Sequence, residues 1–237
     1  MSAMYFSRVT LDKTAGNAAL SSLLDPADRA KAMDAHHRLL WTLFSDSADR
    51  ERDFLWRAGK GGTFYVLSRR EPVPHPLFLP PEVKEFAPVL AAGDRLTFSL
   101  RANATKDRAD VSRLSKHERG GKSRRVDVVM DLLKKLPEGS DRSVERRRLA
   151  EQAALDWMTG QAGRGGFKLS AVRVEDYSVV QLNRPGAGKG SSMVTLGVLD
   201  LIGEIEVTEP ERFVEKLSQG FGRGKAFGFG LMLIRRA

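Results

Sequence analysis

The sequence predicts an α+β fold built from two similar units, and three observations carry this prediction. Stretches whose apolar side chains alternate, as in a strand, are interleaved with stretches whose apolar side chains recur at helical spacing. In the first part of the chain the order is strand, helix, strand, strand, weak helix, strand, and the second half repeats this rhythm. Because that order is typical of the ferredoxin-like fold, we expect two tandem ferredoxin-like (βαββαβ) domains.

The first unit is expected to cover residues 1–104. Met4–Leu11 alternates as a strand. A helix should follow from Asp25-Pro26, where an N-cap residue precedes a proline at the first helical position, to about Phe44. Two short strands joined by glycines indicate a hairpin, and the proline-rich stretch after them must be mostly irregular, with at most a short helix. Arg95–Ala102 alternates cleanly and is expected to be the last strand of this unit. The hairpin strands are Phe54–Arg57 and Thr63–Ser68, and the proline-rich stretch runs from Pro72 to Pro88.

Residues 105–125 are rich in Lys and Arg and nearly free of large apolar side chains. We interpret them as an exposed basic linker or hairpin between the units. The second unit is then expected to cover residues 126–237, with Ser143 capping its first helix. Its expected elements are a strand Val126–Met130, a helix Ser143–Gln161, strands Phe167–Val174, Tyr177–Leu182 and Val194–Val207, a helix Glu209–Gln219 and a strand Gly230–Arg235.

Composition narrows the classes of function. Among the 237 residues, 39 Lys and Arg against 30 Asp and Glu give a net charge of +9. This balance favours a polyanionic partner, and nucleic acid is favoured over a membrane because the charge is not gathered on one amphipathic helix. The alternative is a soluble basic protein without such a partner. The chain has no cysteine, which excludes disulfides and thiolate metal sites. We expect no signal peptide and no membrane segment, and therefore a cytoplasmic location.

The segment QGFGRGKAFGFGLMLI, residues 219–234, is the most informative motif. Glycines tolerate positive φ and let another backbone come close, and exposed N–H groups in such a loop can bind phosphate oxygens. Arg223 and Lys225 would add charge-assisted contacts, and the phenylalanines would anchor the loop to the core. Alternatively, the glycines only let a helix-to-strand turn pack against the neighbouring sheet. The glycines are Gly220, Gly222, Gly224, Gly228 and Gly230.

Four segments together resemble a known family. The C-terminal motif reads Gly-x-Gly, five residues, Gly-x-Gly before a final strand. The other three are the opening MYFSRVTL, the helix segment His37-x-x-x-Trp41-x-Leu43-Phe44 followed by Arg52-Asp53-Phe54-Leu55, and the strand Leu96-x-Phe98-x-Leu100-Arg101-Ala102-Asn103. In order and spacing they resemble the CasE family, the CRISPR repeat-processing endoribonuclease subunit of the Cascade complex (type I-E) in the repeat-associated RNA-binding superfamily.

The resemblance implies a metal-independent endoribonuclease that needs no cofactor and cleaves CRISPR precursor RNA at the repeat stem-loop. It implies that the ribose 2′-hydroxyl attacks its own phosphate, leaving a 2′,3′-cyclic phosphate and a 5′-hydroxyl. It also implies that the protein stays bound to the mature guide RNA and joins other Cascade subunits. A metal-free route needs a proton acceptor, a proton donor and cations that hold the phosphate. Two alternatives are a non-catalytic RNA-binding subunit of such a complex and a basic RNA-binding protein outside CRISPR systems.

The resemblance assigns the acid-base role to His37, which matches the family's catalytic histidine on the first helix. From the residues alone, a single histidine on an apolar helix face is more often a core residue. The neighbouring His36 is a rival, because a shift of one residue exchanges the helix face. Some family members carry a tyrosine where this chain has Asp34, whose carboxylate could orient His37 or favour its protonated form. Tyr5 on the first strand is a candidate substitute for that tyrosine.

Basic residues are expected to hold the scissile phosphate and the RNA hairpin, because duplex RNA is recognised mostly by shape and phosphate. Arg184 and Lys189 lie in a loop where the family keeps basic residues near the cleavage point. Residues of the basic stretch and of the following helix are expected to line the hairpin, although the helix run is alternatively a solvated face. These residues are Lys122, Arg124, Arg125, Arg146, Arg147 and Arg148.

Overall fold

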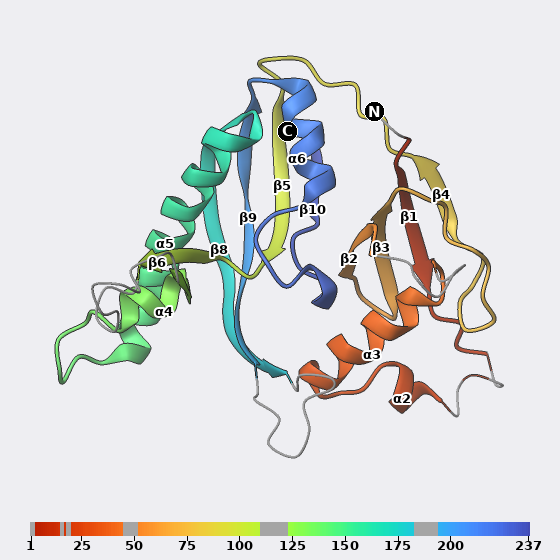
Figure 1. Cartoon of the computed structure of the whole chain (residues 1–237), viewed down its shortest axis with the longest axis horizontal. Coiled ribbons are helices and arrows are strands. Elements are labelled where there is room, and N and C mark those ends of the chain that lie inside the picture. The colour runs from red at the N-terminus through yellow and green to blue at the C-terminus, as the bar shows by residue number, and fades with distance from the viewer. Residues whose placement is uncertain (1–2, 15–16, 18–19, 45–51, 110–122, 183–193) are drawn as a thin grey trace, which may run out of the picture.

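The computed structural model of the chain describes residues 3–14, 17, 20–44, 52–109, 123–182 and 194–237. Two four-stranded antiparallel sheets organise these residues, and helices pack against each of them (Figure 1). Within the described residues, no helix has the length and apolar character needed to cross a membrane. The predicted α+β fold with two ferredoxin-like units is confirmed in its architecture, which is two four-stranded sheets with helices packed against them.

The first sheet has the strand order β2-β3-β1-β4, with β1 and β3 in the middle and β2 and β4 at the edges, as in a ferredoxin-like unit. The sequence pattern placed β1, β2 and β3 to within a residue or so of their observed ends. The elements of this unit are β1 (Tyr5–Thr10), α2 (Ser21–Leu24), α3 (Arg29–Trp41), β2 (Phe54–Ala58), β3 (Thr63–Ser68) and β4 (Glu82–Glu85).

The weak second helix expected in the first unit is absent, because residues 69–81 between β3 and β4 contain no helix. Five prolines in this stretch fix φ and remove backbone N–H donors, which prevents a helix from continuing. Besides the four-residue helix α2, α3 is therefore the helix that packs against the first sheet in the described part of this unit. Its Leu40 packs with Val9 and Phe64 from the sheet in one buried core.

The second sheet has the order β10-β5-β9-β8 and contains β5 (Arg95–Ala102) as a central strand. The expectation that this segment ends the first unit is wrong, since it pairs with β9 and β10 instead. Alternation identifies a strand but not its partner. The real fourth strand of the first sheet, β4, has the sequence EVKE and is exposed throughout, so its pattern gave no signal. We propose that the boundary between the units lies in residues 86–94 rather than at 104.

The remaining elements all belong to the second unit or its hairpin. The basic stretch contributes the paired strands β6 and β7, which confirms the hairpin interpretation for the described residues. The expectation that it lies between the units is wrong, because β5 before it already belongs to the second sheet. The elements are β6 (Thr105–Ala109), β7 (Ser123–Asp127), α4 (Val128–Leu133), α5 (Arg142–Gly165), β8 (Phe167–Leu182), β9 (Val194–Val207), α6 (Pro210–Gln219), the 3-10 helix η1 (Lys225–Phe227) and β10 (Met232–Arg236).

Two aspartates explain where the predicted boundaries in this unit were wrong. The Asp127 carboxylate accepts hydrogen bonds from the backbone N–H groups of Val129 and Met130, so it caps α4 and ends β7 inside the segment expected to be one strand. Asp141 caps α5 in the same way, where Ser143 was expected to do so. The two strands predicted over residues 167–182 are one strand, β8, with two register irregularities.

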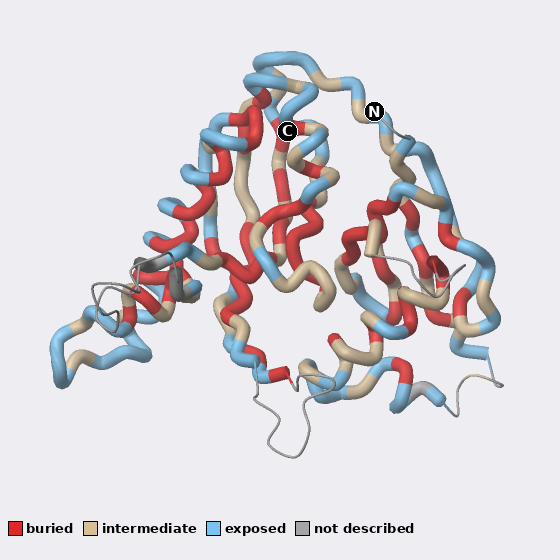
Figure 2. Tube along the Cα trace, viewed as in Figure 1, coloured by how far each residue is buried: buried red, intermediate tan, exposed pale blue. Residues whose placement is uncertain are grey.

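The cores lie between each sheet and its helices, as the buried segments in Figure 2 show. The units also meet through a smaller cluster in which Met33 of α3 packs with Val180 and Leu182 of β8 and with Phe229 of the glycine-rich segment. The helix with both candidate histidines therefore contacts both halves of the chain.

Candidate active site

The two adjacent histidines lie on different faces of helix α3. The side chain of Asp28, rather than of Asp25, caps the helix by accepting from the backbone N–H of Lys31 at 2.8 Å. Asp25 instead accepts a hydrogen bond from Nε2 of His36 at 3.0 Å. The His36 ring is 7% exposed and lies edge-on to Phe64. His36 is therefore a satisfied core residue, and burial lowers the pKa of its imidazole.

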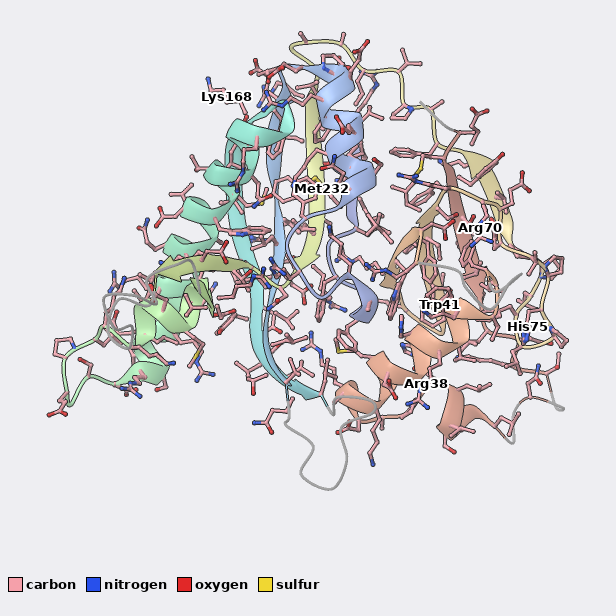
Figure 3. The ribbon with its side chains drawn as sticks, in the orientation of Figure 1. Arg38, Trp41, Arg70, His75, Lys168 and Met232 are labelled. Carbon is pink, nitrogen blue, oxygen red and sulfur yellow. The ribbon has the colours of Figure 1, made fainter. Side chains whose placement is uncertain are left out.

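His37 points to the other side of α3, toward the glycine-rich segment. Its ring centre lies 6.3 Å from that of Phe227 in η1. The indole Nε1–H of Trp41 donates to Nε2 of His37 at 3.2 Å. An indole nitrogen can only donate, so in the neutral ring the proton sits on Nδ1. That Nδ1 is buried and has no hydrogen-bond partner among the described residues. Figure 3 labels Trp41 and the adjacent exposed Arg38 on this helix.

The surroundings of His37 favour its neutral form. Burial lowers the pKa of the imidazole most, and the positive charges of Arg52 and Arg38 lower it further, whereas the Asp34 carboxylate raises it. A pKa below the ordinary value keeps the ring neutral near pH 7. His37 is therefore able to accept a proton at physiological pH.

Arg52 is a functional candidate that the sequence reasoning missed. It lies two residues before the start of β2, and its buried Nη1 has no hydrogen-bond partner among the described residues. Its charge lowers the pKa of both His37 in α3 and Lys225 in the glycine-rich segment, so its guanidinium lies within electrostatic range of both. The only sequence signal was its position at the head of the Arg52-Asp53-Phe54-Leu55 match. A half-buried guanidinium whose Nη1 is unsatisfied within the described part of the chain, and whose charge acts on a neutral imidazole, is suited to holding a phosphate.

The glycine-rich loop, residues 220–230, is attached to both units. The backbone N–H of Arg223 donates to the carbonyl oxygen of Asn103, and that of Gly230 donates to Arg101 at the end of β5. The indole Nε1–H of Trp56 in β2 donates to the carbonyl oxygen of Ala226 at 3.1 Å. The loop thus connects the second sheet with the first unit next to His37.

The expectation that the glycines take positive φ is confirmed, and close approaches explain them. A Cβ on Gly222 would lie 2.6 Å from the carbonyl oxygen of Asn103. Side chains at Gly220 and Gly228 would meet Leu55 and Trp56. The expected anchoring also holds, since the side chains of Phe221 and Phe229 are fully buried. The φ angles are 74° at Gly220, 68° at Gly222, 64° at Gly224, 81° at Gly228 and 90° at Gly230.

The two other candidate catalytic residues are not joined to His37. The carboxylate of Asp34 accepts from Nη2 of Arg38 at 2.6 Å, and the described residues show no hydrogen bond from Asp34 to His37. Asp34 therefore acts on the imidazole through its charge rather than by orienting it. Tyr5 lies at the start of β1 opposite Ser68 and Glu85, and the structure describes no contact between Tyr5 and His37.

The basic candidates differ in their availability. Lys122, Arg184 and Lys189 lie outside the described residues, and the side chain of Arg124 is likewise not described. The others fall into two groups. Paired with carboxylates are Arg125 with Asp107 at 3.4 Å, Arg147 with Glu151 at 3.8 Å and Arg148 with Glu145 at 2.6 Å. Arg146, Arg223 and Lys225 have no ion pair among the described residues. Burial lowers the pKa of the Lys225 ammonium, and the charges of Arg52 and Arg223 lower it further. No cluster of three or more His, Asp or Glu side chains suited to a metal ion occurs in the described part of the chain.

Comparison with known proteins gives a consistent set of relatives. A family model described as CRISPR associated protein matches residues 4–236. The CRISPR-associated endoribonuclease Cse3 of Thermus thermophilus is 28% identical over 159 residues, which cover 64% of this chain and 60% of that protein. The CRISPR system Cascade subunit CasE of Escherichia coli is 27% identical over 207 residues, covering 84% and 89%. A solved structure of CRISPR endoribonuclease Cse3 bound to 19 nt RNA superposes with a TM-score of 0.63 at 25% identity and covers 98% of this chain and 99% of that one.

Proposed function

Because the chain belongs to the CRISPR-associated protein family, we propose that it is a metal-independent endoribonuclease that cuts CRISPR precursor RNA at the repeat stem-loop. In this proposal it remains on the mature guide RNA and joins other Cascade subunits in the cytoplasm. The names of two relatives, an endoribonuclease and a Cascade subunit, support the activity and the assembly. The observation that carries the proposal is the placement of His37 beside Arg52 and the glycine-rich loop.

His37 would transfer the protons of the reaction. The ribose 2′-oxygen forms a bond to the adjacent phosphorus, and the bond from phosphorus to the 5′-oxygen of the next nucleotide breaks. The neutral imidazole accepts the proton of the 2′-hydroxyl at Nε2, after the substrate displaces the Trp41 N–H from that atom, and the resulting imidazolium can return a proton to the departing 5′-oxygen. Its lowered pKa, caused mainly by burial, supports the first of these roles. The products are a 2′,3′-cyclic phosphate and a 5′-hydroxyl.

Arg52 and Lys225 would stabilise the phosphate during this reaction. Negative charge grows on the non-bridging oxygens as the fifth bond to phosphorus forms, and fixed cations stabilise that charge. Both side chains are half-buried, and burial lowers the pKa of each; the charge of Arg52 lowers the pKa of Lys225 further, and an anionic ligand between them would oppose these shifts. Arg223 and Arg146, which have no ion pair among the described residues, are the basic side chains best placed to contact further phosphates without first leaving a carboxylate.

The proposal is tested by cutting a labelled repeat hairpin, taken from the CRISPR array of the same genome, in excess EDTA. His37→Ala is expected to lower the single-turnover rate by about 100-fold to 10,000-fold, the range for general acid-base catalysis, with hairpin affinity little changed. His75→Ala is the matched control, because His75 lies on the proline-rich segment away from the labelled Trp41 (Figure 3). A 2′-deoxy substitution at the cleavage position should abolish cutting as well.

Two results would contradict the proposal. Unimpaired cutting by His37→Ala would remove the histidine from the chemistry. Tight hairpin binding without cutting by any of the proteins would instead identify a non-catalytic RNA-binding subunit. Asp34, which stands where some relatives of the CasE family carry tyrosine, would then be the first residue to replace.

A further inference from the structure

A cleft of about 670 Å³ opens on the second unit, between α5, α6, β6 and the glycine-rich loop. Helices α5 and α6 cover the same face of the second sheet, since side chains of both belong to one core (Figure 1). The loop residues Gly222, Arg223 and Lys225 form the side of this cleft that is nearest to the candidate active site. The cleft is separate from His37, which does not line it.

Four cations line the cleft and have no ion pair among the described residues: Arg164, Lys216, Arg223 and Lys225. The ammonium of Lys216 lies 4.8 Å from the ring centre of Phe221, which holds this side chain in place. Burial lowers the pKa of Lys216, and the charges of Lys225 and Arg164 lower it further. Gathering like charges in a half-buried cleft costs free energy unless an anion enters.

The acidic side chains of the cleft do not neutralise these cations. Asp107 pairs with Arg125 outside the cleft, at 3.4 Å. Asp156 accepts from the side-chain amide of Gln152 at 2.9 Å and keeps its charge, but it forms no ion pair with the four cations among the described residues, and one carboxylate leaves them in excess. The remaining cation, Lys106, is already paired with the buried Asp131. The cleft therefore carries an excess of positive charge, located at the four cations that have no ion pair in the part of the chain that the structure describes.

The unpaired cations continue the phosphate site of the proposed reaction. Lys225 begins η1, whose Phe227 ring centre lies 6.3 Å from that of His37. Lys225 also lines the cleft together with Arg223, Lys216 and Arg164, so the cations lead from the neighbourhood of the imidazole across the loop and into the cleft. A strand whose scissile phosphate lies at His37 meets these cations when it continues over the loop, because successive phosphates follow a path of positive charge.

We propose that the cleft between α5, α6 and the glycine-rich loop binds the phosphates of the single-stranded RNA that flanks the repeat hairpin at the cleavage site. The proposal rests on the proposed ribonuclease function and extends it to a second contact area. Arg164 and Lys216 are its new binding residues, with Arg223 and Lys225 shared between the cleft and the reaction site.

The shape and composition of the cleft favour a single strand. Its volume is that of a small-ligand pocket, which accommodates a short piece of one strand but not a duplex. Its aromatic residue, Trp157, is 8% exposed and offers no open face on which bases could stack. Recognition would therefore be of phosphates, independent of sequence and sensitive to salt.

The test uses Arg164→Gln/Lys216→Gln and a matched control, Lys60→Gln/Lys168→Gln, which removes the same charge from two exposed lysines elsewhere. Figure 3 labels Lys168 at the end of β8 remote from the active-site helix. Affinity is measured for three versions of the repeat hairpin, made with a 2′-deoxy nucleotide at the cleavage position to prevent cutting. One has no flank, one a 5′ flank and one a 3′ flank.

For Arg164→Gln/Lys216→Gln we expect the affinity for one of the two flanked hairpins to fall by roughly tenfold, because charged hydrogen bonds to its phosphates are lost. The affinity for the unflanked hairpin should change by less than about twofold. The slope of log Kd against log salt should fall by about 1.4 for the affected flanked hairpin, since each single-strand phosphate contact contributes about 0.7. The control pair should leave both quantities unchanged.

Three results would overturn the proposal. Equal loss for all three RNAs would place the cleft on the hairpin stem. No loss for any of them would assign its charge to another anion, such as an acidic protein segment. In both cases the native protein still binds these RNAs and cuts the unmodified hairpin in the separate cleavage assay, so the proposed function stands. Failure of the native protein to bind any of the RNAs would overturn both.

Discussion

Replacing Gly222 by alanine measures how far the glycine-rich loop depends on close contact with β5. Gly222 has φ of 68°, and a Cβ there would lie 2.6 Å from the carbonyl oxygen of Asn103. Gly61, in the turn between β2 and β3, has the same φ of 68° but nothing within 4 Å of its Cβ position. Gly61→Ala therefore carries the conformational cost alone, and the difference between the two variants isolates the contact.

The magnitudes follow from this geometry. Left-handed backbone costs a non-glycine residue about 1–2 kcal/mol, and alanine recovers about 0.4–1 kcal/mol by restricting the unfolded chain. Gly61→Ala should therefore lower the free energy of unfolding by about 1 kcal/mol. At Gly222 the backbone must also move away from Asn103 and strain the hydrogen bond from Arg223, and such overpacking adds about 1–3 kcal/mol. The expected total for Gly222→Ala is about 3 kcal/mol.

Thermal unfolding provides the assay, with repeat-hairpin binding as a second readout. For a chain of this size, each kcal/mol lowers Tm by about 2–4 °C, so we expect about 2–4 °C for Gly61→Ala and about 6–12 °C for Gly222→Ala. Hairpin affinity should fall only for Gly222→Ala, because the shift displaces Arg223. If Gly222→Ala were no more destabilising than Gly61→Ala, the close approach to Asn103 would not matter to the fold.

Two further substitutions test the active-site geometry. Arg52→Gln removes a charge that lowers the pKa of His37, so the acidic limb of the pH–rate profile should move to higher pH, whereas Asp34→Asn removes a charge that raises it and should move the limb to lower pH. A base loses activity as pH falls through its pKa, so shifts of both limbs in one direction would contradict the assignment of His37 as the base. Trp56→Phe removes the hydrogen bond to Ala226 while keeping an apolar ring, and the misplaced loop should lower the single-turnover cleavage rate by up to about 100-fold with little change in hairpin affinity. An unchanged rate would show that this bond does not position the loop.

The sequence predicted the elements better than their partners. Periodicity located β1, β3, β9 and α6 because each has a clear apolar pattern. It did not reveal β4, whose four residues are all exposed, and it therefore assigned β5 to the wrong sheet. Helix starts were misplaced where two capping residues were close together, as with Asp25 and Asp28.

The sequence predicted only those parts of the candidate site that belong to a recognisable motif. His37 and the loop glycines stood out through the family resemblance and through the density of glycine. Which of two adjacent histidines faces the core depends on the exact start of α3, and a sequence pattern does not resolve a single residue. The local sequence around Arg52 gave no signal, because its role depends on its proximity to His37 in α3 and to Lys225 in η1, which are distant in sequence.

The candidate site is formed by residues of both units and lies at the joint where they meet. His37 and Arg52 come from the first unit, and Arg223 and Lys225 come from the second. The hydrogen bond from Trp56 to Ala226 and the packing of Met33 against Phe229 hold the two sets together. Neither unit alone contains both His37 and the loop cations. Changes at the joint should therefore impair cutting before they impair folding, and a strand of RNA that spans both units should strengthen the joint in return.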